Sequence, residues 1–252
     1  MRTLLLLTLP LALLTACLTP RAIEEAEHSR SLGLAYLSEG NNGDAIGQLK
    51  ASVKKNKWDP EAWHGLGLAY FGAESHDLAE ESLLKAIDLK EGFSQAHVNL
   101  GSLYLEMERW DDAVAHLEAA LANPEYRQPA RAHHNLGWAH YNKGDFVGAR
   151  EQYREVLRRF PQFCPSLRNL AHVDEAEGKA EDALERFRQA VECDPRDLKS
   201  LISLGILEAR MDLVSDACQH LDTVKEADPY GELRDQAAEF LQMLDCDSVT
   251  KL

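Results

Sequence analysis

The sequence predicts an all-α protein built from repeated helical units, and three observations support this prediction. The pair Leu-Gly recurs within similar flanking sequence at Leu32-Gly33, Leu66-Gly67, Leu100-Gly101, Leu136-Gly137 and Leu204-Gly205. Leu170-Ala171 occupies the equivalent place in the remaining unit. Twelve residues after each Gly or Ala comes an alanine, at Ala45, Ala79, Ala113, Ala149, Ala183 and Ala217. Apolar residues recur at helical spacing, and no alternating pattern typical of strands competes with them.

Successive units begin 34 residues apart, except where two residues are added near Gln128-Pro129. This period and pattern resemble the tetratricopeptide repeat. The resemblance implies helical hairpins that stack into a right-handed superhelix. Six repeats are expected, at 26–59, 60–93, 94–127, 130–163, 164–197 and 198–231.

Small residues are expected where the two helices of a repeat touch. Gly67 or Gly101 should meet Ala79 or Ala113, because a larger side chain would push the helices apart. Large residues should fill the space toward the next repeat, namely Trp63, Tyr70, Leu83, Tyr104, Tyr153 and Phe187. Residues 232–245 form an amphipathic helix that would cap the last repeat, and residues 246–252 form a tail.

The first sixteen residues have the parts of a secretion signal: Arg2, an apolar run and small residues at its end. The run is shorter than the ~20 residues that a spanning helix needs. Leu14-Thr15-Ala16-Cys17 resembles a lipobox, which implies cleavage before Cys17 and lipid on its sulfur and new amine. The alternative is an unprocessed apolar N-terminus with an incidental cysteine.

A lipidated Cys17 would tether the body through residues 17–25, a segment of roughly 28 Å when extended. Leu18 follows the cysteine, where an Asp often means retention in the inner membrane. We therefore expect an outer-membrane lipoprotein with its repeats facing the periplasm. The formal net charge of −15 excludes a general electrostatic route to nucleic acid or to anionic lipid. Membrane attachment is therefore expected to run through the Cys17 lipid and not through a basic patch.

Four further cysteines allow three pairings in an exported chain. In the repeat frame, Cys164 begins the first helix of the fifth repeat and Cys193 ends its second helix. Cys218 lies in the first turn of the next second helix, and Cys246 follows the antiparallel capping helix. This arrangement predicts the disulfides Cys164–Cys193 and Cys218–Cys246. The alternative is four buried thiols.

The sequence offers little sign of catalysis, and we expect neither an enzyme nor a cofactor. Ser82-Leu83-Leu84-Lys85 matches S-x-x-K, but the partner motifs of serine enzymes are missing and Leu83 is a packing position. His133, His134 and His140 share one helix without the usual i, i+4 metal spacing. They are interpreted as large packing residues, with a metal site as the minority alternative.

The inward positions of the first four repeats carry an apolar stripe that no second layer would bury in a monomer. The residues are Leu34, Leu37, Leu68, Phe71, Val98, Leu105, Trp138 and Tyr141. The fifth repeat changes character, with Arg168, His172 and Glu175. An exposed apolar groove rimmed by charge predicts protein binding, here of an amphipathic helix. Alternatively, the N-terminal segment folds back into the groove.

A lipobox, a short tether and six repeats resemble the pilotin lipoproteins of type IV pilus systems. The segment "NPEYRQPARAHHNLG" (123–137) adds to the likeness, because pilotins also carry a short insertion before their fourth repeat. The resemblance implies a protein that binds subunits of the secretin, the outer-membrane pore, and promotes their localisation and assembly. The alternative is a lipid-anchored scaffold for peptidoglycan synthesis or outer-membrane protein assembly.

Overall fold

The computed structural model describes residues 19–228 and 230–246. The predicted signal peptide, Cys17 and residues 247–252 of the predicted tail lie outside them. Within the described residues the chain forms thirteen α-helices and no strand, which confirms the predicted all-α class. The chain divides into two compact units, residues 1–91 and 92–252.

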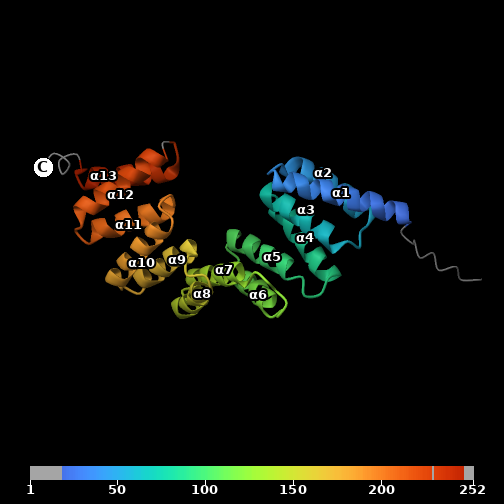
Figure 1. Cartoon of the computed structure of the whole chain (residues 1–252), viewed down its shortest axis with the longest axis horizontal. Helices are drawn as coiled ribbons and strands as arrows, with labels where there is room; N and C mark the ends of the chain where they lie inside the picture. Colours follow the sequence, from blue (N-terminus) through green and yellow to red (C-terminus); the bar gives the residue numbers. More distant parts are fainter. Residues whose placement is uncertain (1–18, 229, 247–252) are drawn as a thin grey trace, which may run out of the picture. The chain divides into compact units, whose positions relative to one another are not determined.

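Each unit is a series of antiparallel helical hairpins (Figure 1). The first unit holds α1 (Pro20–Ser38), α2 (Asn42–Lys55), α3 (Pro60–Gly72) and α4 (His76–Leu89). The second unit holds α5 (Ser94–Glu106), α6 (Trp110–Leu121), α7 (Pro129–Asn142), α8 (Phe146–Arg159), α9 (Cys164–Ala176), α10 (Ala180–Cys193), α11 (Leu198–Arg210), α12 (Val214–Ala227) and α13 (Glu232–Met243). The first helices of neighbouring hairpins also touch. Helix α1 contacts α3, and α7 contacts both α5 and α9.

A large side chain of the second helix presses on the small residue of the first. A Cβ added to Gly67 would lie 2.6 Å from Leu83 Cγ, and one added to Gly137 would lie 2.7 Å from Tyr153 Cε1. Gly101 meets Leu117 in the same way. The expected contact with Ala79 is therefore secondary, because that alanine offers only its backbone oxygen, at 3.3 Å from the Cβ position of Gly67. Close packing depends on the residue sixteen positions after the glycine.

The first helix is longer than the repeat frame predicts. Its N-cap is Thr19, whose Oγ1 accepts a hydrogen bond from the Ala22 amide at 3.2 Å, and Pro20 takes the first helical position. Residues 20–25, expected in an extended tether, are therefore helical. At about 1.5 Å per residue they span roughly 9 Å, which shortens the reach from Cys17 to the body.

Polar contacts join successive hairpins. Asp59 caps α3 by accepting from the Glu61 and Ala62 amides, and the same carboxylate pairs with Arg30 of α1 at 2.5 Å. In the second unit, the buried Asp174 of α9 pairs with Arg150 of α8 at 2.6 Å and with Arg186 of α10. The Arg30–Asp59 and Arg150–Asp174 pairs fix the stacking of one hairpin on the next, whereas Arg186 joins the two helices of a single hairpin.

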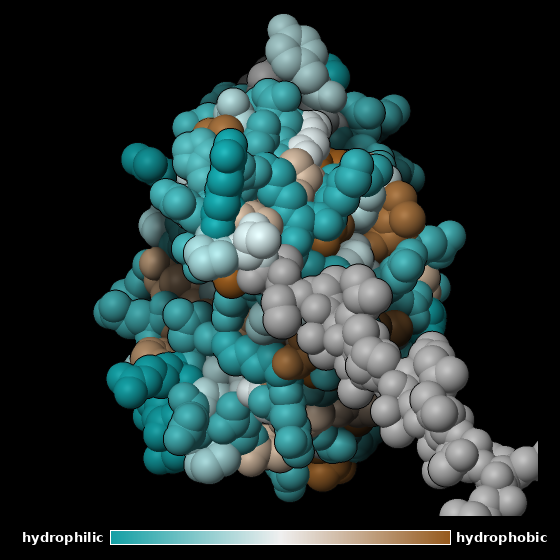
Figure 2. Space-filling model, turned by 90° about the vertical axis from the view of Figure 1, so that its right-hand side faces the viewer, coloured by the Kyte–Doolittle hydropathy of each residue, from teal (hydrophilic) through white to brown (hydrophobic). Residues whose placement is uncertain are grey.

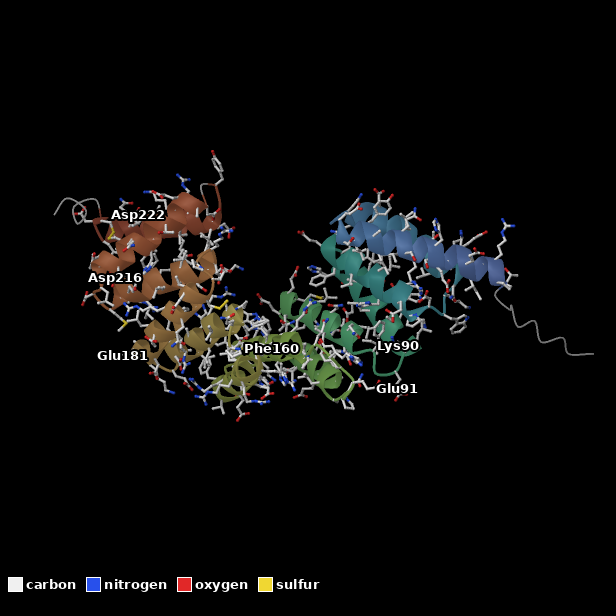
Figure 3. All side chains as sticks on the ribbon, in the orientation of Figure 1. Lys90, Glu91, Phe160, Glu181, Asp216 and Asp222 are labelled. Atoms are coloured by element: carbon white, nitrogen blue, oxygen red, sulfur yellow. A yellow bond between two sulfur atoms is a disulfide. The ribbon has the colours of Figure 1, made fainter. Side chains whose placement is uncertain are left out.

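The surface carries the acidic character of the sequence. The face in Figure 2 is mainly hydrophilic, with apolar residues scattered between polar ones. Glu181 of α10 and Asp216 and Asp222 of α12 lie at the outer edge of the second unit (Figure 3). The excess of carboxylates is thus carried in part by second helices.

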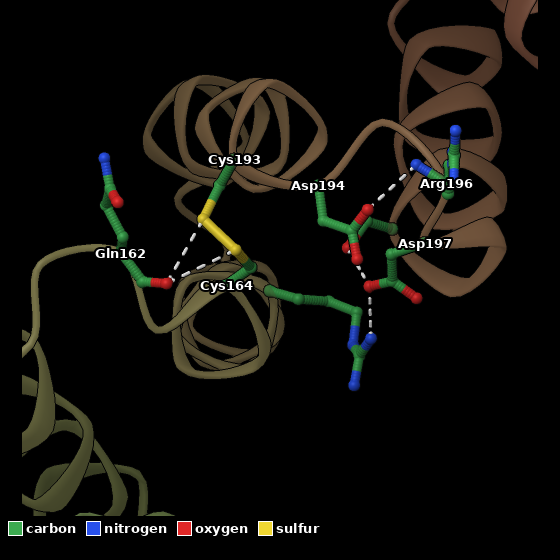
Figure 4. Close-up of a disulfide and its surroundings, with 8 residues drawn as sticks. Gln162, Cys164, Cys193, Asp194, Arg196 and Asp197 are labelled. Carbon is green, nitrogen blue, oxygen red and sulfur yellow. Dashed lines mark hydrogen bonds and ion pairs between the residues drawn. A yellow bond between two sulfur atoms is a disulfide. The ribbon is translucent and has the colours of Figure 1, made fainter.

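Both predicted disulfides are present. Cys164 at the start of α9 is bonded to Cys193 at the end of α10 (Figure 4), with a Cα–Cα distance of 5.6 Å. The Gln162 carbonyl oxygen lies 3.4 and 3.5 Å from the two sulfurs. Cys218 of α12 is bonded to Cys246, which follows α13. The second bond lies in an apolar cluster with Leu221, Ala237 and Leu241, and it fastens the terminal helix.

Candidate partner-binding surfaces

Leu34 and Leu37 on α1 and Leu68 and Phe71 on α3 are the stripe residues predicted for the first unit, and we call them the apolar face of α1 and α3. The two helices approach closely because α3 carries Gly65, where an added Cβ would lie 2.9 Å from Leu34 Cδ2. Even so, Leu34 remains 39% exposed. The other three residues are half-buried. These side chains therefore keep part of their apolar area accessible, and the binding groove itself stays a prediction.

In the second unit, one predicted groove residue is core. Val98 on α5 is only 2% exposed, so it packs inside and cannot contact a partner. Leu105, at the other end of α5, is half-buried and keeps part of its surface accessible. The repeat frame gives the direction of a side chain, but the size of the neighbouring side chains decides its exposure.

Trp138 and Tyr141 on α7 form an aromatic pair. Their ring centroids lie 5.4 Å apart with planes at 10°, a stacked arrangement. The Tyr141 ring also lies 5.7 Å from the Phe146 ring of α8. Both residues of the pair are half-buried, so the stack offers a preformed apolar surface whose side chains are already ordered.

Trp138 also borders an open cavity of about 510 Å³ in the second unit. One side chain from the terminal helix and nine from the first helices line it: His134, Asn135, Trp138, Arg168, Asn169, His172, Lys199, Ile202, Ser203 and Leu233. Asn135, Asn169 and the α11 and α13 members were not among the residues predicted from the sequence. Reading the inward positions of the sixth repeat would have found Lys199 and Ile202, whereas Leu233 lies outside the repeat frame.

Hydrogen bonds and an ion pair hold the polar lining in place. Asn135 Nδ2 donates to Ser102 Oγ at 2.8 Å, and Asn169 Nδ2 donates to the Tyr153 hydroxyl at 3.2 Å. Arg168 pairs with Asp197 at 2.5 Å. This cavity therefore combines an aromatic face, two positioned amides and two cationic residues, Arg168 and Lys199.

The two histidines of the cavity are neutral at physiological pH. Burial, with a contribution from the nearby Arg168 guanidinium, lowers the pKa of His134 to about 4 and that of His172 to about 4. His134 Nδ1 lies 2.9 Å from Ser166 Oγ, and the His172 ring meets Phe187 edge to face at 4.9 Å. Both act as packed side chains with a polar edge.

The other candidate chemical groups have structural partners. His133 bonds to Gln152 at 2.7 Å and His140 to Asp145 at 2.8 Å. Across residues 19–228 and 230–246, no group of three or more His, Cys, Asp or Glu could hold a metal ion. Ser82 of the S-x-x-K match donates to the Leu78 carbonyl at 2.7 Å within α4. None of the helices in this part of the chain is long and apolar enough to cross a membrane.

Comparison with known proteins gives one family and several relatives. The family model described as Tetratricopeptide repeat matches residues 30–92 and 98–162. Protein CTR9 homolog of Arabidopsis thaliana is 28% identical over 163 residues, which is 63% of this chain and 15% of that protein. The type IV pilus assembly protein PilF of Pseudomonas aeruginosa is 25% identical over 127 residues, half of each chain. This chain thus spans half or less of these curated relatives.

Two solved structures have the same fold over most of both chains. PilW, described as a widely conserved type IV pilus biogenesis factor, superposes with a TM-score of 0.77 at 21% identity, over 84% of this chain and 98% of that one. PilF of Pseudomonas aeruginosa gives a TM-score of 0.73 at 19% identity, over 86% and 97%. At these identities the likeness establishes the fold alone.

Proposed function

Since the chain belongs to the tetratricopeptide repeat family, we propose that it works by holding another protein and not by catalysis. We propose further that its process is type IV pilus biogenesis. The observation that carries the proposal is the accessible apolar face of α1 and α3, on which Leu34 is 39% exposed. Exposed apolar side chains gathered on one face are typical of protein-binding surfaces.

The proposed partner is the secretin subunit, bound through an amphipathic segment. Such a segment would lay its apolar side on the face formed by Leu34, Leu37, Leu68 and Phe71 and keep its polar side in water. The likeness in fold to PilW and PilF and the partial sequence match to PilF support the assignment to pili. In this role the protein shields the segment until it enters the outer membrane and the subunits form their multimer.

The proposed location is the outer membrane, with the repeats on the periplasmic side and the Cys17 lipid as the anchor. Two disulfides are typical of chains that mature in an oxidising compartment, which agrees with export. A pilotin needs this location because it must reach the membrane in which the secretin assembles.

The test replaces Leu68 and Phe71 together by glutamate. Burying both side chains under a partner helix would contribute roughly 1.5–3 kcal/mol each, so binding of the secretin should weaken by about two orders of magnitude or more. Both residues are half-buried. The thermal transition should therefore fall only slightly. Binding is measured by co-purification with the secretin, and function by secretin multimers in the outer membrane.

The matched control is Leu78→Glu with Leu84→Glu, the same chemical change at two exposed leucines of α4 in the same hairpin. This control should bind the secretin normally. If the Leu68 and Phe71 variant folds and still supports multimers, the α1–α3 face is not the secretin site. If the wild type does not co-purify with the secretin and another envelope protein does, the pilus assignment itself is wrong.

A further inference from the structure

The end of α2 and the loop after it form a basic segment in an acidic protein. Residues 50–58, "KASVKKNKW", hold four lysines and no acidic residue, although the chain as a whole has a net charge of −15. Lys54, Lys55 and Lys57 are all exposed. Trp58 beside them is 61% exposed, more than any other tryptophan among the described residues. A large aromatic side chain held in solvent plays no part in core packing.

Hydrogen bonds fix the loop that presents this tryptophan. The Trp63 indole Nε1 of α3 donates to the Lys57 carbonyl at 3.0 Å, and the Trp58 amide donates to Asn56 Oδ1 at 3.1 Å. Lys57 Nζ lies 5.0 Å from the centroid of the Trp58 ring. The loop therefore holds a cation and an aromatic ring together, both facing outward.

The basic segment lies beside the start of the first helix. Because α1 and α2 are antiparallel, Lys55 Nζ reaches Glu25 Oε2 at 3.1 Å, and the same carboxylate accepts from Arg21 at 3.0 Å. Cys17 precedes Pro20 by three residues. Three extended residues span about 10 Å, and the five residues from Pro20 to Glu25 add about 7.5 Å of helix. The ammonium groups thus lie within roughly 25 Å of the proposed lipid.

We propose that Arg21, Lys54, Lys55, Lys57 and Trp58, which we call the lysine–tryptophan corner, dock on an anionic lipid surface. The lysines contact lipid phosphates, and the Trp58 ring lies at the level of the headgroups, where amphipathic rings are favoured. This inference rests on the lipid attachment proposed at Cys17. It replaces the expectation from net charge that the membrane is met through the lipid alone.

The acidic groups near the corner offset Arg21 and Lys55 and leave the charges of Lys54 and Lys57 in place. Glu25 is shared between Arg21 and Lys55, and Asp59 is only 7% exposed and paired with Arg30. Glu24 and Glu27 on α1 are exposed, and with Arg21, Glu25 and Lys55 they border an open cavity of about 600 Å³. Lys54 and Lys57 are therefore the cations best placed to meet lipid. Near an anionic surface each basic residue strengthens binding roughly fivefold.

A second attachment also has a physical purpose. Lipid chains hold the protein at the bilayer but do not orient it, whereas a rigid corner on the headgroups fixes one end of the first unit against the surface. The apolar face of α1 and α3 then meets a partner from a defined direction.

The test is quenching of tryptophan fluorescence by brominated lipid. Full-length processed lipoprotein, with Cys17 modification checked by mass spectrometry, is reconstituted in vesicles of phosphatidylglycerol and phosphatidylethanolamine with brominated chains. The chain has four tryptophans. Trp58→Ala should remove most of the quenching, whereas the control Trp138→Phe should leave it unchanged.

Charge is tested by Lys54→Glu with Lys57→Glu, which should lower the equilibrium constant for docking, obtained from the quenching, by about 25-fold or more on these vesicles. The matched control is Lys179→Glu with Lys225→Glu, two lysines of the second unit, which should retain it. Modified Cys17 with equal quenching of wild type and Trp58→Ala overturns the docking alone. An unmodified Cys17 overturns both the proposed anchor and the docking. Equal quenching of the two lysine pairs overturns the role of charge and with it the anionic surface.

Discussion

The contact between each small residue of a first helix and the large residue sixteen positions later is the main packing unit of the hairpin. It pairs Gly33 with Leu49, Gly67 with Leu83, Gly101 with Leu117, Gly137 with Tyr153 and Gly205 with Leu221. The large partners are fully buried. Interiors at crystalline packing density respond to a single added methyl group. The glycines therefore fix how closely the two helices approach.

Gly137→Ala should lower the free energy of unfolding by about 1–3 kcal/mol. The new methyl group would lie 2.7–3.0 Å from three atoms of the rigid Tyr153 ring, which is buried and cannot move aside without moving α8. Urea unfolding measures the loss. Gly47→Ala is the control, because nothing lies within 4 Å of its added Cβ. It should stabilise α2 by about 0.5–1 kcal/mol. Equal effects at the two sites would show that packing on Tyr153 is not the cause.

His172 should make stability depend on pH. Burial beside Arg168 lowers its pKa from 6.5 to about 4 in the folded protein, whereas the unfolded chain takes up the proton near pH 6.5. Stability is thus complete above pH 6.5 and is lost as the pH falls toward 4, by on the order of 2 kcal/mol for this residue. Arg168 and Glu175 are the charged groups nearest to it.

The measurement is the free energy of unfolding between pH 7.5 and pH 4.5. His172→Gln should reduce this pH dependence without abolishing it, because burial lowers the pKa of His134 to about 4 as well. The exposed His28→Gln should retain the full dependence. An unchanged slope in His172→Gln would mean that the imidazole is charged in the folded state.

At the scale of helices, the two disulfides close loops of similar length but lie in different surroundings. They join residues 29 and 28 positions apart, so the entropy of loop closure is nearly the same. Cys164 and Cys193 are half-buried, whereas Cys218 and Cys246 are 3% and 5% exposed. The burial of the two disulfides should therefore decide which one contributes more to the free energy of unfolding.

Replacing both cysteines of a pair by serine should lower stability by about 2–4 kcal/mol for Cys164–Cys193. The loss should be larger for Cys218–Cys246, because two hydroxyl groups then enter the cluster around Leu221 and Leu241. Urea unfolding and proteolysis of α13 measure the two effects. Replacing the same cysteines by alanine instead of serine removes the disulfide without adding hydroxyl groups. The alanine variants therefore separate the loss of loop closure from the cost of burying polar groups. A smaller loss for the buried pair than for the half-buried pair would contradict this reasoning.

The sequence predicted the repeat helices and Cys164–Cys193 well because they follow from the repeat period, and it predicted Cys218–Cys246 because the amphipathic pattern of 232–245 places a helix antiparallel to α12. The start of α1 was misplaced because the first repeat was counted from the residue at which its sequence begins to match the other repeats. The helix itself starts earlier, because Thr19 caps it and Pro20 takes its first position. Val98 was assigned to the groove by its place in the repeat, but its 2% exposure depends on neighbouring side chains that no frame specifies. The cavity bordered by Leu233 combines repeats with a helix outside them, so periodicity could not predict it.

For the whole molecule, Cys17→Ala should separate folding from location. The helices from Pro20 onward are stabilised by contacts among themselves, so the circular dichroism and thermal transition of the folded body should match those of the wild type. Without acyl chains the protein should leave the outer-membrane fraction, since stable attachment needs two or more lipid signals. Fractionation and secretin multimers measure the result. Full outer-membrane residence of Cys17→Ala would refute lipid anchoring.

Among the described residues, the main contacts of each helix are with helices that lie one or two places away along the chain. Folding with so low a contact order can proceed vectorially, from the first hairpin onward, while the rest of the polypeptide is still being delivered. The first unit ends at Glu91, and the first disulfide cysteine is Cys164. Oxidation can therefore begin only after the first unit has been delivered, and a cell short of oxidant should accumulate molecules with a finished amino-terminal unit and a reduced, protease-sensitive carboxy-terminal end.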